Sequence, residues 1–423
     1  MEQLSAEAGG FGNNGGVARR QFLKASGLAA VALTTVPLRA GRAEDVTPSI
    51  TADATMPGPT VRKRPPLAPI KASMDRLLSL EACLRPFRPQ GPRIEAERMG
   101  RKTIVHNYGH GGSGWSLSWG AGRRAVALAQ ATREKQLAVI GCGAIGLTTA
   151  VVAQRAGFKV RIYTKDQIPN VRSFRATGVW SPSARICTLE HATPEFRKSW
   201  EEMARYSYYQ YSAMLGLAGA PIEWIEGYKL SDRPFATGAS LYTHDPYPGE
   251  PQYPHLEDEH TPDLMSGMQA LTPDQHPFPV AHVRRVNMMM FNIPAYARLL
   301  MQEFHSAGGE LVIREFEHPK QFQDLPEKTI IHSTGYAARA LLNDNSLIPV
   351  RGQTARLIPQ PEVDYAISYD SQNVYTIPRR DGMIVQEWSP GDYGNEQEVT
   401  NLEATRASIE KISRLCAQMG VRA

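Results

Sequence analysis

The chain has 423 residues, of which 42% are hydrophobic and 21% charged, so it is long enough for a folded protein of two domains. The net charge of +5 is modest, and no basic tract is interleaved with aromatic residues, which argues against nucleic acid as a partner. The four cysteines are far apart and form no CxxC pair, so neither a disulfide framework nor a zinc site is indicated, and no metal is expected. One disulfide bridge remains an alternative if the protein leaves the cytoplasm.

The first segment is predicted to be an export signal. Arg19–Lys24 (RRQFLK) resembles the twin-arginine signal, an apolar run follows, and Gly41–Ala43 provides small residues for cleavage. The apolar run is much shorter than the roughly 20 residues that span a bilayer. We therefore assign residues 1–43 to a signal for periplasmic or secreted localisation. The alternative is a tail in which the two arginines are adjacent by chance.

The next segment is rich in proline and should be an extended linker over residues 44–72. Compact sequence is expected over residues 73–423, and no stretch in it is long and apolar enough for a transmembrane helix, so the protein should not be an integral membrane protein.

A strand, a glycine turn, a helix and a second strand are predicted in the middle of the chain. The apolar run Leu137–Ile140 precedes Gly141, Gly143 and Gly146, a helical pattern reaches about Ala156, and a strand follows over Lys159–Tyr163. This spacing is typical of a dinucleotide-binding βαβ unit, in which Gly141, Cys142, Gly143, Ala144, Ile145 and Gly146 would surround a pyrophosphate. The alternative is a glycine turn with a purely structural role.

The position that usually binds the adenosine ribose lies about 20 residues after this turn. It is occupied by Lys165, with Asp166 directly after it, so either residue could be the contact.

Further elements follow in chain order. Helices are expected over residues 194–216, 292–307 and 402–419, strands over 310–314 and 329–331, and an antiparallel sheet over 350–390. The first of these helices carries an aromatic stripe that we interpret as facing the core.

Two separated motifs resemble the D-amino-acid oxidase family. His106–Trp115 (HNYGHGGSGW) is similar to that family's HNYGHGGxG signature, and Arg85–Gln90 (RPFRPQ) to its RPxRPQ stretch. In the family both lie after the nucleotide-binding glycines, whereas here they precede them. We therefore interpret the chain as a circularly permuted member, with the resemblance covering about residues 74–418.

The resemblance implies an α/β fold in which an FAD-binding Rossmann-like domain is joined to an antiparallel-sheet substrate domain. The FAD-binding parts would be about residues 84–180 and 310–356, and the substrate or cap parts about residues 181–309 and 357–400. FAD would be the cofactor. Besides the glycine turn with Lys165 and Asp166, the implied cofactor residues are Gly111, Gly112, Ser113, Gly114, Trp115, Ser116, Arg172, Ser173, Thr177, Gly178 and Phe316.

The resemblance also implies the substrate contacts. Arg85 would pair with a substrate carboxylate, and the Tyr375 hydroxyl would hydrogen-bond the same group. Two family tyrosines are replaced by Ser183 and Ser371, which predicts a wider or more polar pocket.

The function implied is oxidation of an amino acid or related amine, with hydride transfer from the carbon bearing nitrogen to flavin N5 and hydrolysis of the resulting imine. Oxygen or another acceptor would reoxidise the flavin. The alternatives are an exported flavin dehydrogenase of secondary or cyclic amines, an NAD(P)-binding dehydrogenase or sensor, and a non-catalytic flavin-binding protein. The sequence does not distinguish oxidase from dehydrogenase, and it predicts neither the substrate nor the oligomeric state.

Overall fold

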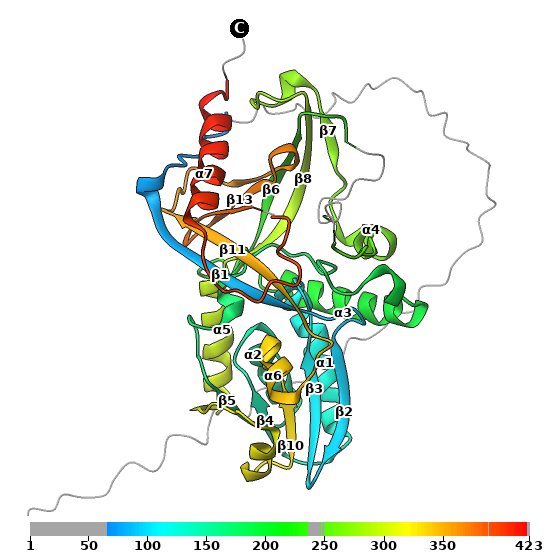
Figure 1. The fold of residues 1–423 in the computed structure, drawn as a ribbon. Coiled ribbons are helices and arrows are strands. Elements are labelled where there is room, and N and C mark those ends of the chain that lie inside the picture. The colour runs from blue at the N-terminus through cyan, green and yellow to red at the C-terminus, as the bar shows by residue number, and fades with distance from the viewer. Residues whose placement is uncertain (1–65, 236–246, 248, 388, 421–423) are drawn as a thin grey trace, which may run out of the picture. The chain divides into compact units, whose positions relative to one another are not determined.

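The computed structural model describes residues 66–235, 247, 249–387 and 389–420 (Figure 1). The predicted signal, residues 1–43, lies outside these ranges. Contacts divide the chain between Lys63 and Arg64, and every element described below belongs to the second unit.

The first sheet has six strands and contains the predicted βαβ unit. Across the sheet the order is β2 (Arg93–Met99), β3 (Lys102–Tyr108), β10 (Thr329–His332), β4 (Gln136–Ile140), β5 (Lys159–Thr164) and β9 (Glu310–Ile313). β2 is antiparallel to β3, and all other neighbouring strands are parallel. Figure 1 shows early strand β3 beside late strand β10. The carboxyl ends of the parallel strands share one edge, where ligands bind in such sheets.

Helices cover one face of this sheet because their small and branched side chains pack against it. The three helices are α1 (Gly114–Gln130), α2 (Ala144–Arg155) and α5 (Ile293–Ser306). Ala125 of α1, Leu147 of α2 and Leu300 of α5 belong to one buried cluster with Val139 of β4. Because α5 packs on α2, it belongs with the nucleotide-binding sheet rather than with the substrate part to which the sequence assigned it.

The second sheet has eight strands. Their order is β1 (Leu77–Phe87), β11 (Ile348–Leu357), β14 (Gly382–Glu387), β13 (Val374–Arg379), β12 (Tyr365–Tyr369), β6 (Ile222–Ser231), β8 (His282–Phe291) and β7 (Gln269–Leu271). Only β12 and β6 pair in parallel; the remaining neighbours are antiparallel. β1 and β11 therefore lie in the second sheet, although the sequence placed residues 84–87 of β1 and 348–356 of β11 in the FAD-binding part.

The last helix, α7 (Leu402–Ala417), packs on the second sheet together with the start of the described chain. Ile70 and Ala72 are buried in the same cluster as Ile412 and Leu415. The Tyr365 hydroxyl donates a hydrogen bond to the Ala68 carbonyl at 2.7 Å. Residues 67–72, predicted as linker, are thus part of the folded unit, because their apolar side chains complete this cluster.

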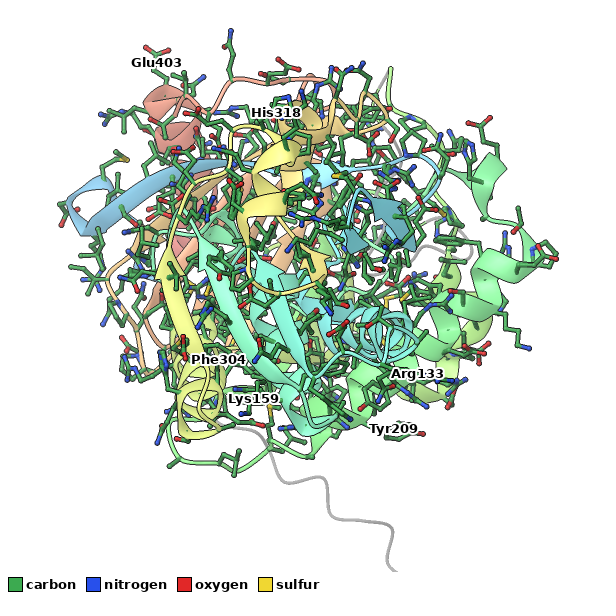
Figure 2. All side chains as sticks on the ribbon, turned by 90° about the horizontal axis from the view of Figure 1, so that it is seen from below. Arg133, Lys159, Tyr209, Phe304, His318 and Glu403 are labelled. Carbon is green, nitrogen blue, oxygen red and sulfur yellow. The ribbon has the colours of Figure 1, made fainter. Side chains whose placement is uncertain are left out.

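Two further helices lie beside α1, namely α3 (Pro194–Ser212) and α4 (Leu256–His260); the remaining short helix is α6 (Ala338–Leu342). The Thr193 side chain accepts a hydrogen bond from the Phe196 backbone, which fixes the start of α3 as predicted. Trp200 and Met203 of the aromatic stripe are buried, whereas Tyr209 is 59% exposed and lies at the margin of the view in Figure 2. The stripe faces the core over only part of its length.

No helix among the described residues has the length and apolar character needed to cross a membrane. All four cysteines are described, and all are free thiols.

Candidate functional site

The predicted dinucleotide turn joins β4 to α2. Gly141 has a φ of +105°, and its N–H donates to the Tyr163 carbonyl at 2.8 Å. A Cβ atom at Gly141 would lie 2.4 Å from the Ser333 carbonyl oxygen, and one at Gly146 would lie 2.0 Å from the Gly141 oxygen. Neither position tolerates a side chain, so the amino end of α2 stays open for an anionic ligand.

A second glycine segment joins β3 to α1. Gly109 and Gly111 have φ values of +87° and +54°. The Gly112 N–H donates to the Ala184 carbonyl at 2.9 Å, and a Cβ atom at Gly111 would lie 1.9 Å from the Arg185 carbonyl oxygen. This segment therefore presses against the turn Ser181–Arg185 with no room for a side chain at Gly111.

Both glycine segments line one cavity of about 330 Å³, at the carboxyl edge of the first sheet. The sequence-predicted residues that line it are Arg85, Gly111, Gly112, Gly114, Trp115, Gly141, Cys142, Gly143, Ala144, Ile145, Lys165, Asp166, Arg172, Ser173, Thr177 and Phe316. Segments separated in the chain thus form one site, as the predicted arrangement requires.

Five predicted residues do not line this cavity: Ser113, Ser116, Gly146, Gly178 and Tyr375. The two serine side chains hold the Ser181–Arg185 turn instead. Ser113 Oγ donates to the Ala184 carbonyl at 3.1 Å, and Ser116 Oγ accepts the Ser181 N–H at 2.8 Å. Gly178 is needed for packing, because a Cβ there would lie 2.6 Å from the Phe291 carbonyl oxygen. These residues lie outside the cavity and support the segments that line it.

Ser173 connects the two glycine segments. Its hydroxyl accepts the Ala144 N–H at 2.9 Å, and its carbonyl accepts the Trp115 indole N–H at 2.7 Å. The neighbouring Arg172 makes two parallel hydrogen bonds to Glu398, of 2.7 and 2.8 Å. The Arg172 guanidinium is therefore engaged by a carboxylate within the protein.

The ribose position contains two candidates with different surroundings. Lys165 Nζ lies 2.6 Å from a Glu315 oxygen, so its charge is already paired. The Asp166 carboxylate accepts no hydrogen bond from another described residue, although the Asp166 backbone carbonyl accepts one from Thr164. The acceptor oxygens of Asp166 make it the better candidate for a ribose hydroxyl.

Arg85 lies flat on the second sheet. A Cβ atom at Gly352 would lie 2.4 Å from Arg85 Nη1, so the guanidinium fits only because residue 352 is glycine. Nη1 donates to the Arg351 carbonyl at 2.7 Å, and no described carboxylate forms an ion pair with Arg85. A positive charge that lines a cavity and forms no ion pair with a described residue is suited to an anionic ligand.

Tyr375 is separated from the cavity by one residue. Its hydroxyl donates to Gln386 Oε1, and Gln386 lines the cavity. Burial raises the pKa of Tyr375 to about 12, so the phenol keeps its proton at neutral pH. The Tyr375 hydroxyl thus bonds a residue that lines the cavity, and the direct substrate contact predicted for Tyr375 stays a prediction.

Ser183 and Ser371, which replace two tyrosines of the family pattern, also lie away from the cavity. Ser183 is buried, and both its N–H and its hydroxyl donate to the Glu257 carboxylate. Ser371 accepts the Asp232 N–H at 2.9 Å. Neither serine widens the described cavity.

Sequence reasoning missed His110, Cys83, Thr354 and Gln386, all of which line the cavity. His110 is within the recognised motif, which was a signal for it. Both of its ring nitrogens are buried without a hydrogen-bond partner among the described residues, and burial lowers its pKa to about 3. The imidazole is neutral and has no hydrogen-bond partner among the described residues, and the two glycine segments present backbone without side chains. Both features fit a flat, polar cofactor such as a flavin dinucleotide.

Comparison with known proteins agrees with this geometry. The model of a family described as FAD dependent oxidoreductase, abbreviated DAO, matches residues 136–422. The chain belongs to this family of FAD-dependent enzymes. FAD, rather than a nicotinamide dinucleotide, is thus its cofactor.

Individual relatives are distant. D-amino-acid oxidase of Rubrobacter xylanophilus is 25% identical over 288 residues, which are 67% of this chain and 77% of that protein. D-amino-acid oxidase of Dictyostelium discoideum is 23% identical over 294 residues, 68% of this chain and 73% of that protein. The structure of glycine oxidase from Geobacillus kaustophilus matches with a TM-score of 0.44 and 14% identity, covering 66% of this chain and 80% of that one.

Proposed function

We propose that this enzyme oxidises the carbon–nitrogen bond of an amino acid or a related amine that carries a carboxylate. The observation on which this rests is Arg85, whose guanidinium lines the same cavity as the two glycine segments and has no carboxylate partner among the described residues. The names of the curated relatives, D-amino-acid oxidases, support a substrate of this class.

Arg85 would bind the substrate carboxylate and so position the carbon bearing nitrogen against the cofactor. FAD would supply the two-electron acceptor. The only acidic side chains lining the described cavity are Asp166 and Glu315, which follow β5 and β9 of the first sheet, whereas Arg85 lies on β1 of the second sheet. His110 is neutral and buried. The substrate's own amine lone pair would therefore assist removal of the α-hydrogen, and water would hydrolyse the imine product.

The test is anaerobic titration of the yellow holoenzyme with a panel of D- and L-amino acids and N-alkyl amino acids. Bleaching of the flavin absorption by one of them would support the proposal, and no bleaching by any member would contradict it. With the active substrate, peroxide yield in air would be compared with reduction of an artificial dye. High peroxide yield identifies an oxidase, and dye reduction without peroxide identifies a dehydrogenase.

Arg85→Ala is the matching mutation. We expect it to keep FAD and to lower kcat/KM by about 1,000-fold, since loss of one partner of a desolvated charge pair costs about 2–5 kcal/mol. Arg124→Ala, at a half-exposed helical position, is the control and should change kcat/KM little. Unchanged kinetics in Arg85→Ala would remove this residue from substrate binding.

We also infer that the chain is a circular permutation of the family fold. The family match begins at residue 136, yet β3, which precedes it, pairs with β10 inside it. α1 ends at Gln130 and β4 begins at Gln136, so a short connection joins the two. The order of segments also differs from the family order between α7 and the residues before β1. α7 and these residues share one buried cluster. Close ends of this kind are what a permutation requires.

Export is proposed from the sequence alone. Arg19–Lys24 and the apolar run after it support a twin-arginine signal and a periplasmic or secreted enzyme. This route would suit a protein that binds its cofactor before export.

A further inference from the structure

Gln386 lies in a row of side chains that crosses the second sheet. Thr354 of β11 is directly opposite Gln386 of β14, and Gln386 is opposite Tyr375 of β13. Directly opposed residues point to the same face of a sheet. Thr354 and Gln386 both line the cavity, so this row faces the site.

Hydrogen bonds fix the orientation of the Gln386 amide. Thr177 hydrogen-bonds to the Tyr375 phenol oxygen, and the phenol donates its proton to Gln386 Oε1. Because the phenol has only one proton, Thr177 must be the donor in the first of these bonds. With Oε1 occupied as an acceptor, the two N–H groups of Gln386 Nε2 remain as donors.

These N–H groups have no acceptor among the described residues. Gln386 is 3% exposed to solvent, yet it lines the cavity, and no hydrogen bond from Nε2 to a described residue is formed. A buried amide donor without an acceptor is costly unless a ligand or water completes it.

The same donors lie close to Arg85. The Arg85 guanidinium covers Gly352, which is two residues from Thr354 along β11 and therefore diagonal to Gln386. Diagonal neighbours on antiparallel strands are separated by about 7–8 Å, within reach of long side chains. One anionic group of two oxygens can thus lie between the guanidinium and the amide.

We propose that Gln386 is a substrate-binding residue, whose amide nitrogen donates a hydrogen bond to the carboxylate paired with Arg85. Tyr375 is a positioning residue, which acts through Gln386 and does not touch the substrate. The inference rests on the proposed function. It adds that the acid group of the substrate accepts hydrogen bonds from a guanidinium and an amide together.

The test uses the purified holoenzyme and propionate, a carboxylate without an amine, so that binding is measured without turnover. Calorimetry and the perturbation of the flavin spectrum would both report the Kd. Gln386→Leu should raise the Kd by about 10- to 100-fold, the effect of a hydrogen bond to a charged group. Gln386→Glu has nearly the same shape and retains an acceptor for Tyr375, but it replaces the donor with an anion. It should weaken binding at least as much.

Tyr375→Phe separates positioning from packing. It leaves the glutamine in place but frees its amide to rotate, so the Kd for propionate should rise by a smaller factor, about 3- to 10-fold. With the oxidisable substrate, KM should rise in the same proportion while kcat changes less. Gln353→Leu is the matched control, because Gln353 is on the neighbouring strand and its side chain bonds the Asn401 carbonyl and the Thr405 hydroxyl, away from Arg85.

The proposal is overturned if Gln386→Leu and Gln386→Glu bind propionate as the wild type does, or if Gln353→Leu loses as much affinity as they do. An unchanged Kd and KM in Tyr375→Phe would refute its positioning role. Failure of the proposed function has a different signature, since no amine would then bleach the wild-type flavin, whatever the propionate affinities.

Discussion

The two glycine segments of the site line the same cavity but are held in different ways. Gly141–Gly146 is fixed by its own sheet, because the Gly141 N–H donates to the Tyr163 carbonyl of the next strand. Gly109–Gly114 is fixed by the Ser181–Arg185 turn, whose Ala184 carbonyl accepts bonds from Gly112 and Ser113.

This turn is itself held by a buried carboxyl group. Glu257 of α4 is 1% exposed and accepts two hydrogen bonds from Ser183, and it forms no ion pair with a described residue. The first segment is therefore a local motif that its sequence specifies, whereas the second depends on a distant element. A backbone segment can have a recognisable sequence and still owe its position to residues that the motif does not contain.

The largest effect is expected from Gly111→Ala, which tests whether the Ser181–Arg185 turn holds the second glycine segment. The new Cβ would meet the Arg185 carbonyl oxygen and would also require a side chain at a φ of +54°. Backbone strain and overpacking each cost about 1–3 kcal/mol, so we expect a loss of about 4 kcal/mol in the free energy of unfolding. Urea denaturation without FAD would measure it. Gly114→Ala, where a Cβ meets nothing within 4 Å, is the control. Equal stability of the two variants would show that the turn does not hold the segment.

The Glu257 support predicts a dependence of stability on pH. Burial raises the pKa of Glu257 to about 7, whereas in the unfolded chain it is about 4.5. Between these values the native protein holds a proton that the unfolded chain has released, so stability falls as the pH rises through this window, by about 3 kcal/mol in total. Glu257→Gln should remove this contribution when unfolding is measured from about pH 5 to about pH 8.

Glu190, whose side chain is 75% exposed, provides the control, since Glu190→Gln should keep the wild-type slope. Parallel slopes for wild type and Glu257→Gln would mean that this carboxyl group is ionised throughout and that its support is not sensitive to protonation.

Much of the fold follows from local patterns. The strand, glycine turn and helix around Gly141, the start of α3 at Pro194 and the position of α7 lie where periodicity and capping place them. The long pair β6 and β8 was not predicted, although it forms the far part of the second sheet. Strands of such a sheet are specified by long-range pairing, which a single sequence does not reveal.

The site residues also divide into those that a local motif reveals and those that depend on long-range pairing. The glycines and Arg85 are recognisable because each belongs to a short motif with a fixed spacing. Gln386 is not, because β14 is buried along nearly its whole length and its sequence has no alternation that shows which side chains face the cavity. The hydrogen bond from Tyr375 to Gln386 was not predicted for a related reason, since it depends on a partner from another strand. Which group donates and which accepts in a hydrogen-bond network is determined only in the folded protein.

The smallest effect is expected at Ser173, where the two segments are joined. Its hydroxyl accepts the Ala144 N–H at the start of α2, so Ser173→Ala should cost about 1 kcal/mol of stability when unfolding is measured without added FAD. A pyrophosphate bound at the glycine turn would compete for the same N–H, so the loss should be smaller in the holoenzyme, and FAD should bind at least as tightly as in the wild type. Ser173→Thr, which retains the acceptor, should resemble the wild type. If Ser173→Ala instead weakens FAD binding in equilibrium titration, the Ser173 hydroxyl contacts the cofactor directly rather than competing with it for the Ala144 N–H.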